Sequence, residues 1–156
     1  MKQLLVIRHC NPEGENRLSE VGLKQVEKLK EKFASEFAPT QRFSFHSSKK
    51  GRTERTITPL AELVGQSLID VEFHDFLFSD DRTDFERALR EICDLLLSLE
   101  SKADVVVLCT HDELAFALPN HYADVMLGRK IRKEKLTQGE AMLINTLDGS
   151  FSIWRQ

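Results

Sequence analysis

The stretch Leu4-Leu5-Val6-Ile7-Arg8-His9 decides the fold. Four consecutive apolar residues followed by two polar ones are typical of a strand that is buried on both faces of a sheet. A second run of this kind, Val105-Val106-Val107-Leu108-Cys109, is followed by Thr110 and His111. Sites in α/β proteins lie beyond the carboxyl ends of parallel strands, so the pattern places His9 and His111 at equivalent points of one site.

Helical patterns lie between and after these strands. Val26, Leu29, Phe33 and Phe37 recur at steps of three and four residues, which predicts a helix that begins near Ser19.

Other helices are predicted farther along the chain. The segment Thr83–Glu86 has the form of a capping box, and an apolar face then extends to Leu99. Two more helices are predicted around residues 57–64 and over residues 114–127. Pro59 implies either a kink or the first residue of its helix, and Pro119 implies a kink or a restart.

Three further segments predict strands. Residues 42–45 and 67–73 read as short strands, and Asn11 to Asn16 reads as a loop. Near the C-terminus, Asp148-Gly149 separates two apolar segments, 141–147 and 151–154, and predicts a hairpin. Strands that alternate with helices predict an α/β/α sandwich of three layers with a mostly parallel sheet, here with a C-terminal hairpin. No repeat or linker interrupts the chain, so residues 1–156 are expected to form a single domain.

Composition excludes several classes of protein. A hydrophobic fraction of 41% and a charged fraction of 30% are those of a globular domain. The net charge of -3 argues against a nucleic-acid partner. No segment approaches the roughly 20 apolar residues of a membrane span, so no membrane partner is expected. The three cysteines are odd in number and lack C-x-x-C spacing, which favours a reducing cytoplasmic location.

Four motifs resemble those of one known family, in the same order. They are Arg8-His9-Cys10, the segment Leu18–Gln25, the segment from Ser47-Ser48 through Arg52 to Thr56, and the valine-rich strand that ends at His111. Together they resemble the signatures of the histidine phosphatase (phosphoglycerate-mutase-like) superfamily. The chain is most similar to the small phosphohistidine phosphatase branch of that family.

The resemblance implies a role for each motif residue. His9 is the expected nucleophile that becomes phosphohistidine, and Arg8 and Arg52 are expected to hold the phosphoryl oxygens with their planar forks of donors. His111 is expected to bind the same group as an imidazolium. Asn11, at the start of the adjoining loop, is a further expected substrate contact. The chemistry requires no metal and no cofactor, and we expect none.

The sequence departs from the family pattern at several points. Cys10 replaces a glycine, and Lys49 replaces a proline. One extra residue precedes Arg52, which leaves Arg55 as the alternative arginine.

The general acid of the larger family members has no clear counterpart. Asp75, Asp80, Asp81 and Asp112 are the candidates, and the phosphohistidine branch also lacks this acid. A phosphoramidate has an imidazole leaving group that is easily protonated, so it depends less on a placed acid.

Three functions compete. The first is hydrolysis of a phosphomonoester or phosphohistidine, with a phosphorylated small molecule or a phosphohistidine protein as partner. The second is a catalytically weak module that binds phosphorylated ligands on the same fold. The third is a cysteine phosphatase that uses Cys10, which we disfavour because Glu13 and Glu15 would repel a phosphate in that loop.

The other histidines and cysteines receive structural interpretations. His46, His74 and His121 are separated in the sequence without ligand spacing, so we predict no metal site from them. Cys93 and Cys109 are predicted to pack in the core.

Overall fold

One six-stranded sheet organises the molecule. The computed structural model describes residues 1–78 and 82–156, without the side chains of Arg82 and Thr83. The strand order is β5-β4-β6-β1-β7-β8. The strands are β1 (Gln3–Arg8), β4 (Phe43–Ser47), β5 (Val71–Phe73), β6 (Val105–Thr110), β7 (Ala141–Asn145) and β8 (Phe151–Trp154). The first four strands in this order are parallel, and β7 runs antiparallel to both β1 and β8.

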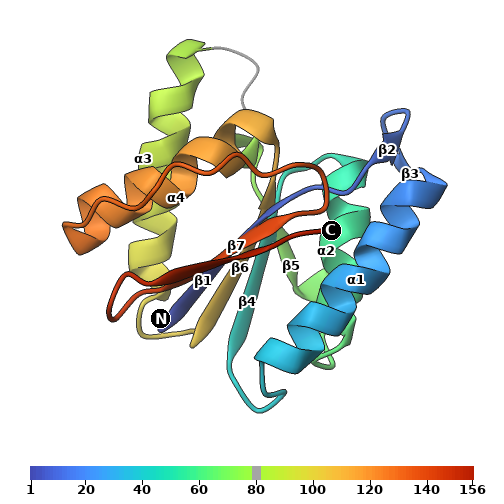
Figure 1. Cartoon of the computed structure of the whole chain (residues 1–156), viewed down its shortest axis with the longest axis horizontal. Helices are drawn as coiled ribbons and strands as arrows, with labels where there is room; N and C mark the ends of the chain where they lie inside the picture. The colour runs from blue at the N-terminus through green and yellow to red at the C-terminus, as the bar shows by residue number, and fades with distance from the viewer. Residues whose placement is uncertain (79–81) are drawn as a thin grey trace.

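Two pairs of helices cover the sheet, and Figure 1 shows one pair on each side. The first pair is α1 (Glu20–Glu36) and α2 (Gly51–Glu62), and the second is α3 (Arg82–Leu99) and α4 (Asp112–Leu127). The predicted three-layer α/β/α sandwich is therefore confirmed. In the described part of the chain no helix has the length and apolar composition needed to cross a bilayer.

The continuous apolar run in β1 follows from burial on both faces. Leu5 and Ile7 pack in the layer of α1 and α2, whereas Leu4 and Val6 pack in the layer of α3 and α4. All four side chains are fully buried. Alternation of side chains along the strand therefore gives each face two apolar residues.

Several boundaries differ from the sequence predictions. Only Val71–Phe73 of the segment 67–73 is a strand, because residues 68–70 form a turn of 3-10 helix. Asp70 causes this turn: its carboxylate accepts hydrogen bonds from the backbone and hydroxyl of Ser67. The predicted loop from Asn11 to Asn16 contains β2 (Pro12–Glu13), which pairs with β3 (Arg17–Leu18).

The alternatives that the two helical prolines left open are settled. Pro59 lies inside α2 and Pro119 inside α4, so neither begins a helix. Helix α3 begins at Arg82, and the predicted capping box of Thr83 lies outside the described side chains. The predicted C-terminal hairpin is confirmed as β7 and β8.

The start of α1 fixes the loop that follows His9. Ser19 is the N-cap, and its hydroxyl accepts a hydrogen bond from the backbone of Gly22. The backbone N–H of Ser19 donates to the carbonyl of Asn11 at 3.0 Å. A Cβ atom on Gly22 would lie 2.2 Å from that same carbonyl oxygen. Glycine at this position therefore lets the loop after β1 approach the helix.

We predict that Gly22→Ala destabilises the protein. Replacement of glycine by alanine inside a helix is ordinarily stabilising, by about 0.5–1 kcal/mol. Here the new methyl group meets backbone that cannot rotate away, so a loss of about 1–3 kcal/mol is expected. Urea denaturation measures the change, with Val21→Ala on the exposed face of α1 as the control. A Gly22→Ala protein as stable as the wild type would contradict the close approach.

Candidate active site

His9 and His111 lie together at the carboxyl edge of the sheet. β1 and β6 are adjacent parallel strands, and Arg8 pairs in register with Thr110. The residue after each strand is therefore a histidine at the same level. Their ring centroids are 5.0 Å apart, with an angle of 58° between the planes. The two segments that carry them are about 100 residues apart in the chain, and only the strand pairing brings them together.

Two arginines flank the imidazoles. Arg8 at the end of β1 donates through NH1 to the Leu136 carbonyl and pairs with Asp112, both at 2.9 Å. Its Nε is buried and has no hydrogen-bond partner among the described residues. Arg52, in the first turn of α2, places Nε and NH2 at 3.4 and 3.3 Å from Nδ1 of His111.

Arg55 is not part of this cluster. Its Nε donates to the carbonyl of Asn16, and the side chain is exposed. The structure therefore selects Arg52 over Arg55 as the arginine beside the histidines. The extra residue before Arg52 is accommodated because α2 begins at Gly51, where a Cβ atom would lie only 2.8 Å from the side-chain oxygen of Asn16.

The hydrogen bond of His9 determines which nitrogen is free. Nδ1 lies 2.8 Å from the Cys10 carbonyl, which can only accept, so Nδ1 carries the proton. Nε2 then holds the lone pair. Burial lowers the pKa of His9, and the charges of Arg52 and Arg8 act in the same direction, while the bond to Cys10 opposes them. His9 is consequently a neutral imidazole with a free Nε2 at pH 7.

The tautomer of His111 is the opposite one. The Arg52 guanidinium can only donate, so Nδ1 of His111 accepts and Nε2 carries the proton. Nε2 donates to the Ser48 hydroxyl at 2.8 Å, and that hydroxyl contacts Thr53 at 2.8 Å. Burial, the neighbouring His9 and the charge of Arg52 lower the pKa of His111 to about 3.

Two helices begin at this edge of the sheet. α2 starts after Lys50 and α4 starts after His111, which is its N-cap. The N-terminus of a helix carries partial positive charge and unpaired N–H groups. With Arg8 and Arg52, the site therefore concentrates positive potential around two neutral imidazoles, an arrangement that suits a tetrahedral dianion.

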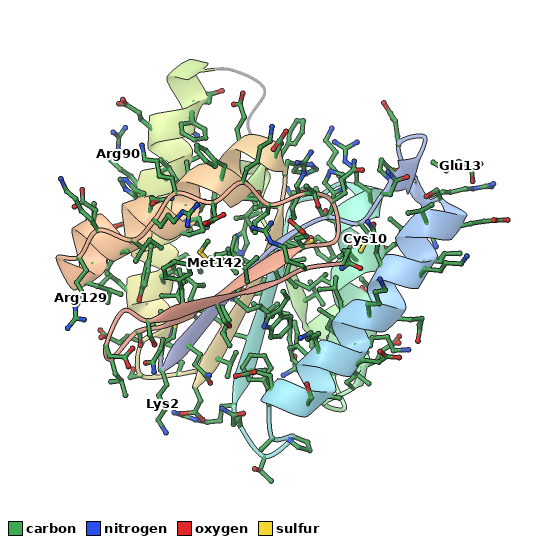
Figure 2. The ribbon with its side chains drawn as sticks, viewed as in Figure 1. Lys2, Cys10, Glu13, Arg90, Arg129 and Met142 are labelled. Carbon is green, nitrogen blue, oxygen red and sulfur yellow. The ribbon has the colours of Figure 1, made fainter. Side chains whose placement is uncertain are left out.

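Cys10 is a structural residue. Its side chain is fully buried, and its backbone N–H donates to the Thr56 hydroxyl at 3.0 Å. Burial raises the pKa of the thiol to about 12, so no thiolate forms at neutral pH. Figure 2 shows Cys10 inside the molecule near α2, whereas Glu13 lies at the outer end of the β2–β3 hairpin. These observations argue against the cysteine phosphatase.

Asn11 holds the loop after the nucleophile. Its amide nitrogen donates to Gln138 at 2.6 Å, and its amide oxygen accepts from the Ser19 hydroxyl at 2.8 Å. The backbone N–H of Asn11 donates to Gln25 at 2.8 Å. Both ends of the side chain thus have protein partners, and contact of Asn11 with substrate stays a prediction.

The candidate acids occupy different surroundings. Asp112 is the first residue of α4 and pairs with Arg8, so its carboxylate borders the cluster. Asp75 pairs instead with Lys49 at 3.0 Å, and its side chain is 84% exposed. Asp80 and Asp81 lie outside the described residues.

Sequence reasoning assigned no role to several residues that shape the site. Ser48 and Thr53 orient His111. The hydroxyl residues between β4 and α2 could have been recognised in the sequence as possible hydrogen-bond partners of a site residue. The Phe78 ring packs edge-on against His111, with centroids 4.7 Å apart, and Lys50 lies 4.4 Å above Phe78. Nothing in the sequence pattern pointed to Phe78, because it lies in an irregular segment.

The interpretation of the remaining histidines is wrong in part. His46 and His74 do not lie apart: Nδ1 of His46 is 3.0 Å from Nε2 of His74. His46 lies on β4 and His74 directly follows β5, the strand that pairs with β4. This pairing could not be inferred from the separation of 28 residues.

The solved structures that the fold resembles include phosphatases and a hydrolase. No protein-family model matches the chain, and no curated protein matches its sequence. A candidate phosphohistidine phosphatase, SixA, from Nakamurella multipartitia superposes with a TM-score of 0.68 at 11% identity, covering 99% of this chain and 94% of that chain. "Mycobacterial hydrolase 1" has a TM-score of 0.67 at 16% identity, with 93% and 89% covered.

A third structure is the mycobacterial glucosyl-3-phosphoglycerate phosphatase with VO3, at a TM-score of 0.65 and 14% identity, with 98% and 97% covered. The mixed α/β fold matches such neighbours over nearly the full length of both chains. The chain therefore has the fold of the histidine phosphatase (phosphoglycerate-mutase-like) superfamily.

Proposed function

We propose that this protein is a phosphatase that transfers a phosphoryl group to Nε2 of His9 and then to water. The observation that carries the proposal is that His9 and His111 lie side by side, with Arg52 bonded to His111 and the charge of Arg8 acting on both rings. Phosphoryl transfer needs an in-line nucleophile and positive charge around the equatorial oxygens. The cluster offers both from residues that are remote in sequence.

In the first step the Nε2 lone pair of His9 attacks phosphorus. The bond between phosphorus and the leaving atom breaks, and the leaving group takes the electron pair and a proton from solvent. Arg8 and Arg52 hold the equatorial oxygens, and the buried Nε of Arg8 is a donor available for this contact. Since Nδ1–H stays bonded to the Cys10 carbonyl, the ring keeps its orientation during attack.

In the second step water attacks phosphorus and inorganic phosphate leaves. The bond between phosphorus and Nε2 breaks, and its electron pair returns to His9. The proton of the attacking water passes to solvent or to the Asp112 carboxylate, which borders the cluster through Arg8. The cycle ends with His9 in its original tautomer.

The charge of His111 depends on the bound ligand. The sequence predicts an imidazolium beside a phosphoryl dianion, whereas a pKa of about 3 makes the ring neutral at pH 7 when no anion lies beside it. A phosphoryl dianion between the two rings would bring opposite charge and raise this pKa. We therefore assign His111 the role of accepting a proton on Nδ1 as substrate binds, while Arg52 moves its hydrogen bonds to the phosphoryl oxygens.

The substrate class we favour is phosphohistidine on a protein or a phosphorylated small molecule. The structural neighbours include a candidate phosphohistidine phosphatase and a sugar-phosphate phosphatase, which support these two choices. An imidazole leaving group needs little help from a general acid. This suits the site, because the carboxylate that borders the cluster, Asp112, is paired with Arg8.

A large cavity lies beside the reacting groups rather than on them. It measures about 770 Å³ and is bordered by Lys50 and Phe78, of which Phe78 contacts the His111 ring. Its size is in the range of small-ligand pockets. We assign it to the part of the substrate that carries the leaving group.

We predict that His9→Ala loses at least about 10³-fold in phosphate release, because it removes the nucleophile. The wild type should also acquire label from a ³²P-phosphorylated substrate, in a form stable to alkali, and His9→Ala should not. His121→Ala, on α4 outside the cluster, is the control for a lost histidine. Turnover that persists in His9→Ala would end the proposal, and binding of vanadate by the wild type without any turnover would favour the binding module instead.

A matched pair of arginine variants tests the register of the phosphate clamp. Arg52→Ala is expected to lower kcat/KM by about 10²–10³-fold, since a donor to the transferring group is lost. Arg55→Ala, three residues along the same helix, should retain activity within a few-fold because its guanidinium donates to the Asn16 carbonyl and not to the histidines. Equal losses in the two variants would contradict the assignment.

The lowered pKa of His111 predicts a loss of stability in acid. The pKa is about 3 in the folded chain, against an ordinary value of 6.5. Between these values the unfolded chain binds a proton that the folded chain does not, so the stabilisation present above pH 6.5 is lost as the pH falls. Urea denaturation in phosphate-free buffer should show that the drop in unfolding free energy from pH 7 to pH 5 is smaller in His111→Gln, by about 2 kcal/mol. Equal drops in both proteins would contradict the assigned environment.

A further inference from the structure

Three side chains converge on the outer part of the sheet, away from the phosphoryl cluster. Nδ1 of His46 lies 3.0 Å from Nε2 of His74. One carboxylate oxygen of Glu72 lies 3.7 Å from the first nitrogen and 3.8 Å from the second. Among the described residues, this is the one group of three or more potential ligands drawn from His, Cys, Asp and Glu side chains that meets closely enough to hold a metal ion.

The sheet itself builds this group. His46 on β4 pairs in register with Glu72 on β5, so both side chains project from the same face. His74 follows Glu72 by two residues, and its backbone N–H donates to the Ser47 carbonyl, which continues the pairing. The spacing of two residues returns its side chain to the face of Glu72. The placement is therefore set by backbone pairing and not by a loop.

The three distances suit a single cation. The point equidistant from the three atoms lies about 2 Å from each, the bonding distance of Zn²⁺ to histidine nitrogen and carboxylate oxygen. Two imidazoles and a carboxylate are also a ligand set that zinc accepts, with water in the remaining coordination position.

The surroundings of His46 match those of a ligating imidazole. Its other nitrogen, Nε2, lies 2.8 Å from the Ser44 hydroxyl, so a proton on Nε2 leaves Nδ1 with its lone pair directed at the site. The His46 side chain is fully buried, whereas that of Glu72 is 62% exposed. An ion would reach the site from the solvent side of Glu72, without opening the core.

A hydrogen bond between the two imidazoles is the competing explanation. It accounts for the 3.0 Å separation of His46 and His74, since one nitrogen would donate to the other. It leaves unexplained why the carboxylate of Glu72 lies nearly equidistant from both nitrogens when solvent is open to it. A shared cation accounts for all three positions.

We infer that His46, Glu72 and His74 form a binding site for a divalent transition-metal ion, with Zn²⁺ the best fit. The ion would join β5 to β4 at the edge of the sheet. Its ligand His46 lies two residues before Ser48, whose hydroxyl bonds to His111. Its ligands are not residues of the phosphoryl cluster, although His74 also borders the cavity of about 770 Å³. The inference stands whether or not the protein is a phosphatase.

The test is stoichiometric metal binding by the full, untagged chain. Zn²⁺ is titrated in competition with a chromophoric chelator, and Co²⁺ is titrated with detection of the visible bands of a tetrahedral site. The wild type should bind one equivalent of each metal. Glu72→Gln and His74→Gln should weaken Zn²⁺ binding by at least about tenfold and abolish the Co²⁺ bands.

Two control variants separate this site from other histidines. His121→Gln removes a histidine on α4, and His111→Gln removes one from the phosphoryl cluster; both should bind as the wild type does. Because His46 is fully buried, His46→Gln is informative only with an unchanged circular dichroism spectrum, and the variants at Glu72 and His74 carry the test. The inference is overturned if the wild type binds less than one equivalent, if Glu72→Gln and His74→Gln bind normally, or if His111→Gln abolishes binding.

Discussion

The parallel pairing of β1 with β6 is the constraint on which the site depends. Each strand has a continuous apolar run that is buried on both faces, so its register is fixed by two separate cores. A slip of one residue would turn every buried side chain of β1 to the opposite layer. The same register brings His9 and His111 to the same level, with ring centroids 5.0 Å apart. The energy that positions the imidazoles is thus the energy of the hydrophobic core.

Electrostatics at this edge depend on uncharged histidines surrounded by permanent charges. Burial and the guanidiniums of Arg52 and Arg8 lower the pKa of His9. A lone pair and a positive field can then coexist within a few ångströms, which nucleophilic attack on a phosphoryl group requires. The two rings have opposite tautomers because their partners differ: a carbonyl accepts from His9, and a guanidinium donates to His111. Similar residues thereby acquire different tasks.

Much of this arrangement could be predicted from the sequence, and the reasons for the exceptions are physical. Burial on both faces requires an unbroken apolar run, so β1 and β6 could be predicted from the sequence. The residues that follow these strands were correctly placed at one edge of the sheet. The pairing of β4 with β5 could not be predicted, because β5 has only three residues and β4 lies about 25 positions earlier in the chain. For that reason the proximity of His46 and His74 was missed. The lowered pKa of His111 was also not predicted, since it depends on burial and on charges from two segments, residues 8–9 and 50–52.

The brevity of β5 has a consequence for how molecules of this protein meet one another. An outermost strand offers unpaired N–H and C=O groups on which a strand of another chain can align. Here that margin is only Val71–Phe73, with the charged Glu72 at its centre, and turns of 3-10 helix adjoin it on both sides. An edge strand this short offers few hydrogen bonds to a strand of another molecule. The short β5 edge therefore disfavours aggregation through strand pairing at this side of the sheet.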